Sequence, residues 1–436
     1  MGSHLGCRIP IWILQARNCT VVLSMEAQAM KIVLVQTKVP WLSAWEALNL
    51  GYIKAYAEQF DSTWDFEFYS GFFDSDKEII DACSNADVVG FTCTTPQMAH
   101  ARRIIEGISF SDGTPKLVIG GVHASAQPKH TLEISDYAVQ GEGEMAFVKI
   151  LHGKATPGII RMPYVEDLDY LPPPDRHFIK QYRNIEVAFK DNKERIGAIF
   201  SSRGCPYNCC FCSSREVWSR KFRMHSPKRV VEEMKGLVND WSIDFIKFSD
   251  DTFTVSDERV SEICDLIKQE NLKVPWGCNI RANTSDELLK KMKGSNCREV
   301  WVGAESGDDK ILQDMKKGIT TEMVRHIFKT AKGLDLFTRA YFMIGMPNDS
   351  WETIEKTKEL AREIQADMYG FSIYDALPNN SLWKDEYLKT RNLEQMDEYN
   401  NPWTTTKTLS NEDLQVAQRM LCKEFKGRMC WRQKDG

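Results

Sequence analysis

Short apolar runs alternate with amphipathic stretches over two successive parts of the chain. In the first part the runs are rich in β-branched residues, as is typical of strands buried on both faces of a sheet. They cover residues 31–36, 64–69, 87–94, 116–121 and 137–140, with helical patterns between them at 44–60, 77–84 and 97–107. Strands that alternate with helices predict a doubly wound parallel sheet.

The second part repeats this alternation with six further strands. They are predicted at residues 197–200, 245–249, 276–280, 300–302, 339–344 and 368–374. The intervening helices are amphipathic and have clear N-terminal signals, such as Ser226-Pro227 and Asp349-Ser350. Six strand–helix units predict a partial (β/α)6 barrel of the TIM type, since a complete barrel has eight.

The predicted fold class is therefore α/β, in five segments. Residues 1–29 fit the pattern poorly and are expected to be a disordered leader. Residues 30–150 are expected to form the Rossmann-like sheet and residues 196–380 the partial barrel. The linker between them, residues 151–195, contains three consecutive prolines, which favour an extended segment. Residues 381–436 are expected to be a C-terminal segment, helical from 411 to 428.

Composition limits the partners and the compartment. The 436 residues include 56 Lys and Arg against 61 Asp and Glu, a net charge of −5, so neither nucleic acid nor an anionic membrane is an expected partner. No apolar run is long enough to cross a bilayer. The 13 cysteines lack the spacing of a secreted scaffold. They indicate reduced thiols in a cytoplasmic protein.

Three cysteines, Cys205, Cys209 and Cys212, are separated by three and two residues in a loop that follows an apolar run. Iron–sulfur clusters are held by cysteine thiolates, usually four, so three thiolates leave one iron open for a ligand. The alternative is a zinc knuckle with His225 as the fourth ligand. The remaining cysteines of this part lie outside the spacing and are expected to be core or surface thiols. They are Cys210, Cys264, Cys278 and Cys297.

Polar and small residues follow the predicted strands of both parts. Ligands of such sheets and barrels bind at the carboxyl ends of the strands. In the second part these ends carry Ser249-Asp250-Asp251, Arg281 and Glu305, a recurrence for which a zinc knuckle gives no reason. In the first part they carry three small-residue loops, where a ligand can approach the backbone closely. These loops are residues 92–95, 120–125 and 141–144.

The cysteine trio, with Phe211 just before its last member, resembles the signature of the radical S-adenosylmethionine (radical SAM) superfamily. The resemblance implies that Cys205, Cys209 and Cys212 hold a 4Fe–4S cluster whose open iron chelates SAM. It implies that Ser249, Asp250 and Asp251 bind the methionine amino group. Arg281 and Glu305 would contact the SAM carboxylate and ribose, and Ile344 and the Phe211 backbone would lie near the adenine. The alternatives are helix capping for Asp250 and Asp251, and a structural ion pair for Arg281 and Glu305.

The first part, with "GFTCTT", "VIGGVHAS" and "GEGE", resembles the cobalamin-binding domain that precedes many radical SAM domains. The resemblance implies cobalamin contacts from Thr92, Thr94, Thr95, Gly120, Gly121, His123, Gly141 and Glu142. The Asp-x-His-x-x-Gly motif of cobalamin mutases is absent, so no cobalt ligand is expected from the first loop. His123 is either an alternative ligand or an ordinary loop histidine. A vestigial domain that binds nothing is the other alternative.

Together the two resemblances imply a radical SAM enzyme of the class B-like methyltransferase subfamily, which methylates an unactivated carbon with cobalamin. The alternative is a non-methylating cyclisation, dehydration or rearrangement with a vestigial cobalamin domain. A methylthiotransferase would need a further cysteine trio, which Cys83 and Cys93 do not supply. A degenerate enzyme or a corrinoid carrier is the non-enzymatic alternative. The expected partners are an unidentified small molecule or peptide substrate and an electron donor such as flavodoxin or ferredoxin. In relatives the segment after the barrel helps to close the substrate site.

Overall fold

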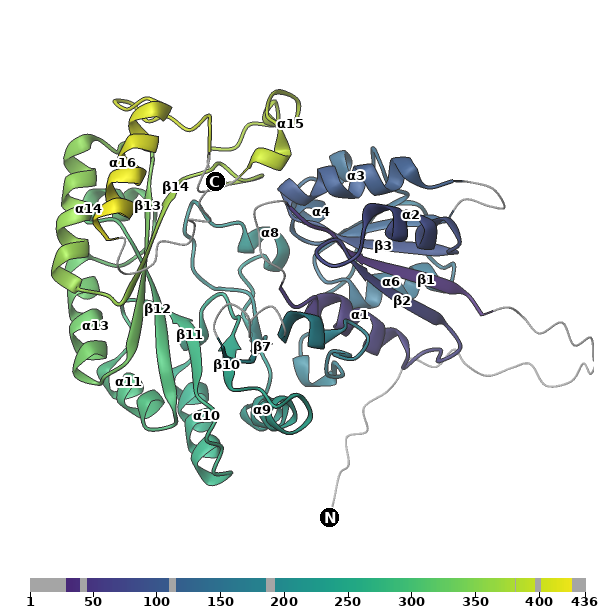
Figure 1. Cartoon of the computed structure of the whole chain (residues 1–436), viewed down its shortest axis with the longest axis horizontal. Helices are drawn as coiled ribbons and strands as arrows, with labels where there is room; N and C mark the ends of the chain where they lie inside the picture. The colour runs from purple at the N-terminus through teal and green to yellow at the C-terminus, as the bar shows by residue number, and fades with distance from the viewer. Residues whose placement is uncertain are drawn as a thin grey trace, which may run out of the picture.

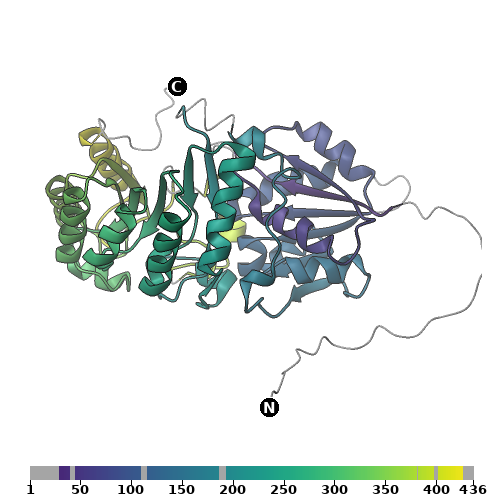
Figure 2. The ribbon, with the colours of Figure 1, turned by 90° about the horizontal axis from the view of Figure 1, so that it is seen from below.

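The computed structural model describes residues 29–39, 45–109, 115–185, 193–380, 382–396 and 401–425. Of the expected leader, residues 1–28 lie outside the described part of the chain. The remainder forms two parallel six-stranded sheets with helices packed on them, side by side in both ribbon views (Figure 1, Figure 2). The α/β prediction, a Rossmann-like sheet followed by a partial barrel, is confirmed.

The first sheet has the strand order β2-β1-β3-β4-β5-β6, and every neighbouring pair is parallel. Its strands are β1 (Lys31–Gln36), β2 (Asp65–Ser70), β3 (Val88–Thr92), β4 (Lys116–Gly120), β5 (Tyr137–Gln140) and β6 (Gly158–Arg161). Side chains of β1 alternate between two cores: Ile32 and Leu34 pack on one face, and Val33 and Val35 on the other. This double burial explains why the strand reads as a continuous apolar run.

Helices cover both faces of this sheet. They are α1 (Leu48–Ala57), α2 (Asp76–Ser84), α3 (Met98–Gly107), α4 (Val122–Ala126), α5 (Pro128–Thr131) and α6 (Glu144–Leu151), with the 3-10 turn η1 (Thr95–Gln97). Two features differ from the prediction. The short helices α4 and α5 follow β4, and β6 extends the sheet into the segment expected to be the linker. The pattern gave no signal for β6 because it is four residues long and only Ile160 is buried. The domain boundaries themselves stay a prediction.

The second sheet has the order β14-β13-β12-β11-β10-β7 and is parallel throughout. Its strands are β7 (Ile196–Ile199), β10 (Phe245–Phe248), β11 (Trp276–Ile280), β12 (Cys297–Glu305), β13 (Phe337–Ile344) and β14 (Met368–Ile373). The covering helices are α9 (Pro227–Trp241), α10 (Asp257–Gln269), α11 (Asp286–Lys293), α12 (Asp309–Asp314), α13 (Thr321–Gly333) and α14 (Trp351–Ile364). Ser226 and Ser350 cap α9 and α14, as their sequence signals predict.

Shorter elements connect and follow these units. They are η2 (Leu168–Tyr170), β8 (Ser202–Arg203), α8 (Ser214–Trp218), β9 (Arg223–Met224), η3 (Phe253–Val255), α15 (Tyr387–Thr390), η4 (Leu393–Gln395) and α16 (Asn411–Glu424). Helix α16 packs on β14, where Gln418 donates to the carbonyl of Phe371 at 2.8 Å. The predicted continuation of this helix at 426–428 lies outside the described residues.

The proline-rich connector is bound to both units. Asp175 accepts a 2.6 Å hydrogen bond from Lys54 of α1. The next residue, Arg176, donates to Glu233 of α9 at 2.7 Å and to the carbonyl of Ala198 on β7 at 2.8 Å. The connector therefore holds the two units against each other as well as spanning the distance between them.

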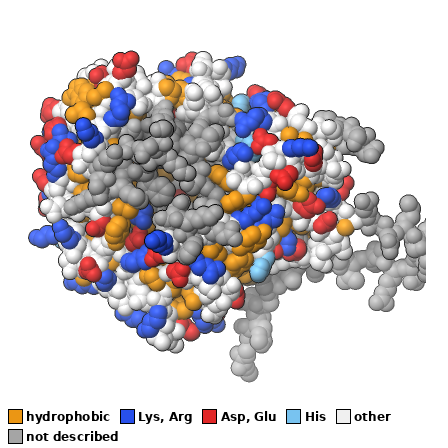
Figure 3. All heavy atoms as spheres, viewed as in Figure 1, with side chains coloured by type: hydrophobic (Ala, Val, Ile, Leu, Met, Phe, Trp, Pro, Cys, Tyr) orange, Lys and Arg blue, Asp and Glu red, His pale blue; other side chains and the backbone are white. Residues whose placement is uncertain are grey.

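On the surface, acidic and basic side chains are interspersed over the face seen in Figure 3. Among the described helices, none combines the length and the apolar character needed to cross a bilayer.

Candidate active site

A cavity of about 520 Å³ lies between the carboxyl-end loops of the two sheets. The first sheet contributes Thr94, Thr95 and Val122, and the second contributes Cys212 and Glu305. The residues from the first sheet lie at least 90 positions before those from the second in the sequence, and the fold brings them to one cavity. Of the predicted site residues, Thr94, Thr95, Phe211, Cys212 and Glu305 line this common cavity.

The cysteine loop follows β7. The thiol of Cys205 lies 3.8 Å from the Thr252 hydroxyl, and the backbone N–H of Ser214 donates to the Cys212 sulfur at 3.4 Å. Burial, with smaller contributions from the charges of Asp251, Cys209 and Cys205, raises the pKa of Cys212 to about 11, although the hydrogen bond from the Ser214 N–H acts to lower it. Burial also raises the pKa of Cys205. The trio is thus gathered closely enough for the thiols to influence one another's ionisation.

Two features shape this loop. Gly204 has a φ of +90°, and a Cβ there would overlap the carbonyl of Lys221, so only glycine fits. Cys210 turns away: its backbone N–H donates to the Met315 carbonyl at 3.0 Å, and its thiol lies 3.5 Å from the Asp314 carbonyl. Cys210 belongs to the barrel core, which also contains Cys264, Cys278 and Cys297. The prediction that these four cysteines are core or surface thiols is confirmed, because all four lie in the core.

His225, the fourth ligand of the zinc alternative, contacts the connector instead. His225 is buried, and its Nδ1 lies 3.0 Å from Asp169 on the connector. Over the described residues, no three His, Cys, Asp or Glu side chains converge on a point that could hold a single ion. A zinc knuckle needs four ligands around one metal, whereas the cysteines of an iron–sulfur cluster are spread over separate irons.

Asp250 does not line the cavity. Its carboxylate accepts 2.6 Å hydrogen bonds from the Ser201 hydroxyl and the Ser202 backbone N–H, and burial raises its pKa to about 6. These contacts brace the start of the cysteine loop and cap no helix. Asp251 accepts a 2.5 Å hydrogen bond from Ser214 Oγ, and burial raises its pKa too. Ser249 donates its backbone N–H to the Ile199 carbonyl at 2.8 Å.

Arg281 is buried beside the cysteine loop. Its guanidinium lies 3.7 Å from the centre of the Tyr207 ring, and Nη1 lies 3.9 Å from the Cys209 sulfur. Nη2 donates to the backbone carbonyl of Lys317. Glu305 lines the cavity and pairs with the Lys317 ammonium at 2.6 Å. Glu305 therefore does form an ion pair, but with Lys317 rather than with Arg281.

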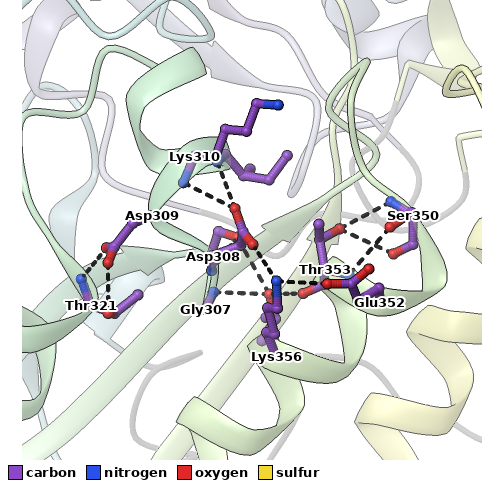
Figure 4. Close-up of polar contacts among 12 residues, drawn as sticks. Gly307, Asp308, Asp309, Lys310, Thr321, Ser350, Glu352, Thr353 and Lys356 are labelled. Carbon is purple, nitrogen blue, oxygen red and sulfur yellow. Dashed lines mark hydrogen bonds and ion pairs between the residues drawn. The ribbon is translucent and has the colours of Figure 1, made fainter.

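The loop after Glu305 is held by α14 (Figure 4). The backbone N–H of Gly307 donates to Thr357 Oγ1 at 2.9 Å, and a Cβ on Gly307 would overlap the Lys356 carbonyl. Lys356 bridges Asp308, at 3.0 Å, and Glu352, at 2.9 Å. Glu305 itself has a φ of +62°, a backbone conformation that residues other than glycine rarely adopt. The contacts with α14 hold the loop that follows this residue.

The two residues expected near adenine lie in different environments. Phe211 is half-buried and lines the cavity, with its ring centre 5.7 Å from Lys317 Nζ. Ile344 is 1% exposed and packs in the barrel core instead of lining the cavity. Ile344 is the last residue of β13, and its backbone carbonyl accepts a hydrogen bond from the Tyr374 N–H at 2.7 Å.

In the first sheet, the glycines of the β4 loop differ in function. Gly121 has a φ of +96°, and a Cβ there would lie 2.8 Å from the Cys93 carbonyl oxygen, so the backbone itself requires glycine. At Gly120 the nearest atom to an added Cβ is the Cβ of Val139, at 3.9 Å. Gly120 therefore leaves open space at the sheet edge. The Thr92 hydroxyl, one strand away, accepts from Asn49 at 2.6 Å.

His123 is fully buried, with both ring nitrogens engaged. Nδ1 lies 3.1 Å from the Thr95 hydroxyl, and Nε2 lies 2.9 Å from Nδ1 of His130. Burial, with a further contribution from His130, lowers the pKa of His123 to about 3. The side chain therefore supports the loop as a neutral imidazole and offers no nitrogen to the cavity.

The Gly141–Glu144 loop binds the cysteine loop. Glu142 accepts from Arg203 at 2.7 Å and from Arg223 at 2.9 Å, and Glu144 accepts from Arg203 at 2.6 Å. Gly141 has a φ of +82° and donates its N–H to Ser125 Oγ at 3.0 Å. Glu142 thus forms ion pairs that connect the two units, and it does not line the cavity.

Sequence reasoning missed much of the cavity wall. Strand β13 contributes Tyr341, the segment after β14 contributes Tyr374, and the tail contributes Met396. Asp375 also lines the cavity and accepts from Trp403 Nε1 at 3.1 Å. Its place directly after the strand predicted at residues 368–374 was the available signal. Met396 agrees with the expectation that the segment after the barrel closes the site.

Comparison with known proteins agrees with this architecture. The family model of the radical SAM superfamily matches residues 199–361, and the model of the B12 binding domain matches residues 42–151. An uncharacterized methyltransferase of Pyrococcus horikoshii is 33% identical over 324 residues, 70% of each chain. The chain therefore belongs to the radical SAM superfamily, in the group that carries a B12-binding domain. It is a radical SAM enzyme, and its cofactors are a 4Fe–4S cluster, SAM and cobalamin.

Other relatives differ in their reactions. An anaerobic magnesium-protoporphyrin IX monomethyl ester cyclase of Rubrivivax gelatinosus is 26% identical over 79% of this chain and 66% of its own. The radical SAM methyltransferase TsrM from Kitasatospora setae has the same fold, with a TM-score of 0.66 at 18% identity, over 80% of this chain and 75% of that one. The cobalamin-dependent SAM radical enzyme OxsB gives a TM-score of 0.64 at 17% identity, over 94% and 63%.

The residues present fit these cofactors. Cys205, Cys209 and Cys212 are only partly buried, whereas Cys210 lies in the barrel core, so three thiols of this loop are available to a cluster with one open iron. The open space at Gly120 provides the close backbone approach that a flat ligand needs. Because His123 is engaged on both sides, the cobalamin fits only without an imidazole ligand from this loop.

Proposed function

We propose that this protein is a cobalamin-dependent methyltransferase that transfers a methyl group from SAM to an unactivated carbon. The observation that carries the proposal is the cavity shared by both sheets, lined by Thr94 and Thr95 on one side and by Cys212 and Glu305 on the other. Methylation by this route needs the methyl carrier and the radical source to reach the same substrate carbon. A cavity with one wall from each unit meets that requirement.

Cys205, Cys209 and Cys212 are the proposed cluster ligands. When bound, the cofactors supply an electron that cleaves SAM to a 5′-deoxyadenosyl radical and a carrier for the methyl group. The chain's own part is positioning. Gly204 shapes the loop, Asp250 braces its start, and Arg281 places a positive charge 3.9 Å from the Cys209 sulfur. A cation beside a thiolate stabilises its charged form.

Glu305 is the proposed contact to SAM from β12, since it alone of the predicted acids lines the cavity. Ser249 and Asp251 are proposed to face the methionine amino group, which requires acceptors. Phe211 is proposed beside the adenine, and Ile344 acts only through its backbone because its side chain is in the core. Asp250 is reassigned from a SAM contact to a brace of the cysteine loop.

Cobalamin is proposed to lie on the carboxyl edge of the first sheet, over Gly120 and against Thr92, Thr94 and Thr95. Gly121, His123, Gly141 and Glu142 support these loops from behind. The substrate, a small molecule or a peptide, would enter between Tyr341, Tyr374 and Met396. A flavodoxin or ferredoxin in the cytoplasm is the proposed electron donor.

The test is anaerobic incubation of the reconstituted protein with SAM and a chemical reductant. Methyl transfer predicts about one equivalent of S-adenosylhomocysteine per bound cobalamin, together with slow release of 5′-deoxyadenosine. Protein reconstituted without cobalamin should release 5′-deoxyadenosine alone. If the cobalamin-loaded protein also forms only 5′-deoxyadenosine, the non-methylating alternative, with a cyclase as its nearest precedent, replaces the proposal. Release of neither product by protein with an intact cluster would contradict SAM cleavage altogether.

A further inference from the structure

Lys317 touches both residues that the sequence predicts for the SAM carboxylate and ribose. It lies in the loop between α12 and α13. Its ammonium pairs with Glu305 at 2.6 Å, and its backbone carbonyl accepts from Arg281 Nη2. One residue outside every predicted motif therefore joins the end of β11 to the end of β12.

The pair is enclosed. The Lys317 and Glu305 side chains are each 11% exposed, so the ion pair is little screened by water. The Lys317 ammonium also lies 5.7 Å from the centre of the Phe211 ring, one residue before Cys212. Gly303, two residues before Glu305, makes room for the pair: a Cβ there would lie 2.7 Å from Lys317 Nζ and would overlap the Glu305 carboxylate.

We propose that Lys317 is a positioning residue of the SAM site, which holds and neutralises the Glu305 carboxylate so that Glu305 can contact SAM. This inference rests on the proposed function and extends it to a residue that neither the sequence motifs nor the comparisons single out. Glu305 lies on a backbone turn with a φ of +62°, and the ion pair selects one orientation of its side chain. Without Lys317 its buried charge would be uncompensated and would turn toward water.

The experiment measures SAM affinity and iron content of the anaerobically reconstituted full chain. Lys317→Met should raise the Kd for SAM about tenfold to a hundredfold, the cost of a lost charged hydrogen bond, while the iron content stays that of the parent protein. Lys317→Arg should retain most of the affinity because it keeps the charge. The neighbouring Lys316, which is exposed, provides the matched control, and Lys316→Met should bind SAM as the parent does.

A double-variant cycle separates positioning from a general structural effect. If Lys317 acts through Glu305, Lys317→Met should add little to the defect of Glu305→Gln. Gly303→Ala keeps both charges but pushes them apart, and should also weaken SAM binding. Additive effects of the two single variants, or an unchanged Kd in Lys317→Met, would overturn the inference. Failure of the parent protein to bind SAM would instead contradict the proposed function, so the two failures are distinguishable.

Discussion

Arg203 on the cysteine loop donates to Glu142 of the first sheet across 2.7 Å, with side chains 10% and 3% exposed. The same guanidinium donates through Nη2 to Glu144 at 2.6 Å. Because Arg203 stands two residues before Cys205, this buried contact fixes the cysteine loop to the loop that follows β5. Together with Arg223, which also pairs with Glu142, Arg203 therefore helps to fix the position of the cluster relative to the cobalamin edge.

Arg203→Met should destabilise the folded protein by about 3–5 kcal/mol, because it leaves two buried carboxylates with less compensating charge. The measurement is denaturant unfolding of the full chain. Lys221→Met is the matched control: Lys221 pairs with Glu166 at the exposed surface, and its loss should change stability little. Equal effects of the two substitutions would contradict the claim that the buried contact joins the units.

The sequence was sufficient for the cysteine trio and for the strands buried on both faces, for physical reasons, whereas the short strand β6 gave no signal. Strands such as β1 are buried on both faces and read as unbroken apolar runs, and the trio is a local spacing. The direction in which each side chain points could not be predicted from the sequence. Asp250 and Asp251 are neighbours in the motif, yet one braces Ser201 and Ser202 while the other reaches Ser214. Which of two adjacent acids faces the loop or the ligand depends on the turn after β10.

Contacts between residues far apart in the sequence could not be predicted either. The resemblance to a cobalamin-binding domain implied a cobalamin contact for Glu142, but its partners Arg203 and Arg223 come from the second unit. Likewise Lys317 carries no motif and gains its importance only where the loop after α12 meets the end of β12. Charge pairs between segments far apart in sequence leave no pattern in either one.

Asp250→Asn should change how stability depends on pH. The folded protein holds the Asp250 proton up to about pH 6, whereas the unfolded chain releases it near pH 4. The parent protein should therefore lose stability as pH rises from about 4 to 6, by about 2–3 kcal/mol in total. Asparagine keeps an acceptor for the Ser202 N–H and has no proton to lose.

The measurement is the free energy of unfolding of parent and Asp250→Asn at pH 4.5 and pH 7. Between pH 4.5 and pH 7, the free energy of unfolding of Asp250→Asn should rise relative to that of the parent. Asp250→Ala is the control, since it removes the brace and should be less stable at both pH values. Parallel pH profiles for the parent and the asparagine variant would mean that Asp250 is ionised in the fold at pH 4.5.

Cys205, Cys209 and Cys212 should each be required for the cluster, whereas Cys210 should not. Reconstituted parent protein should contain about four irons per chain, and each trio cysteine replaced by Ala should lose them. Cys210→Ala is the matched control, because this thiol lies in the barrel core near the Asp314 carbonyl. Loss of the cluster in Cys210→Ala, with the fold intact by circular dichroism, would show that the ligand set is different.

Gly120→Leu should prevent cobalamin binding without unfolding the chain. A Cβ added at Gly120 meets no protein atom closer than 3.9 Å, so the leucine is expected to extend into the space proposed for the corrin. Gly121 cannot serve this test, because its φ of +96° and the nearby Cys93 carbonyl would strain any substituent. Gly333→Leu is the control, since a Cβ there also has nothing within 4 Å. The outcome is measured as the absorbance of hydroxocobalamin that stays bound after desalting. Undiminished binding in Gly120→Leu would mean that the corrin binds elsewhere.

Cobalt in the bound cofactor should have no histidine ligand. His123 is the one histidine in the predicted cobalamin loops, and its two ring nitrogens already contact Thr95 and His130 at 3.1 and 2.9 Å. Burial lowers its pKa to about 3, so it remains neutral and its contacts persist across the physiological pH range. The electron paramagnetic resonance spectrum of the cob(II)alamin form should show no nitrogen superhyperfine splitting from His123, and His123→Ala should leave that spectrum unchanged. Splitting that disappears in His123→Ala would instead mean that cobalamin binding breaks the contacts to Thr95 and His130 and turns the imidazole toward the metal.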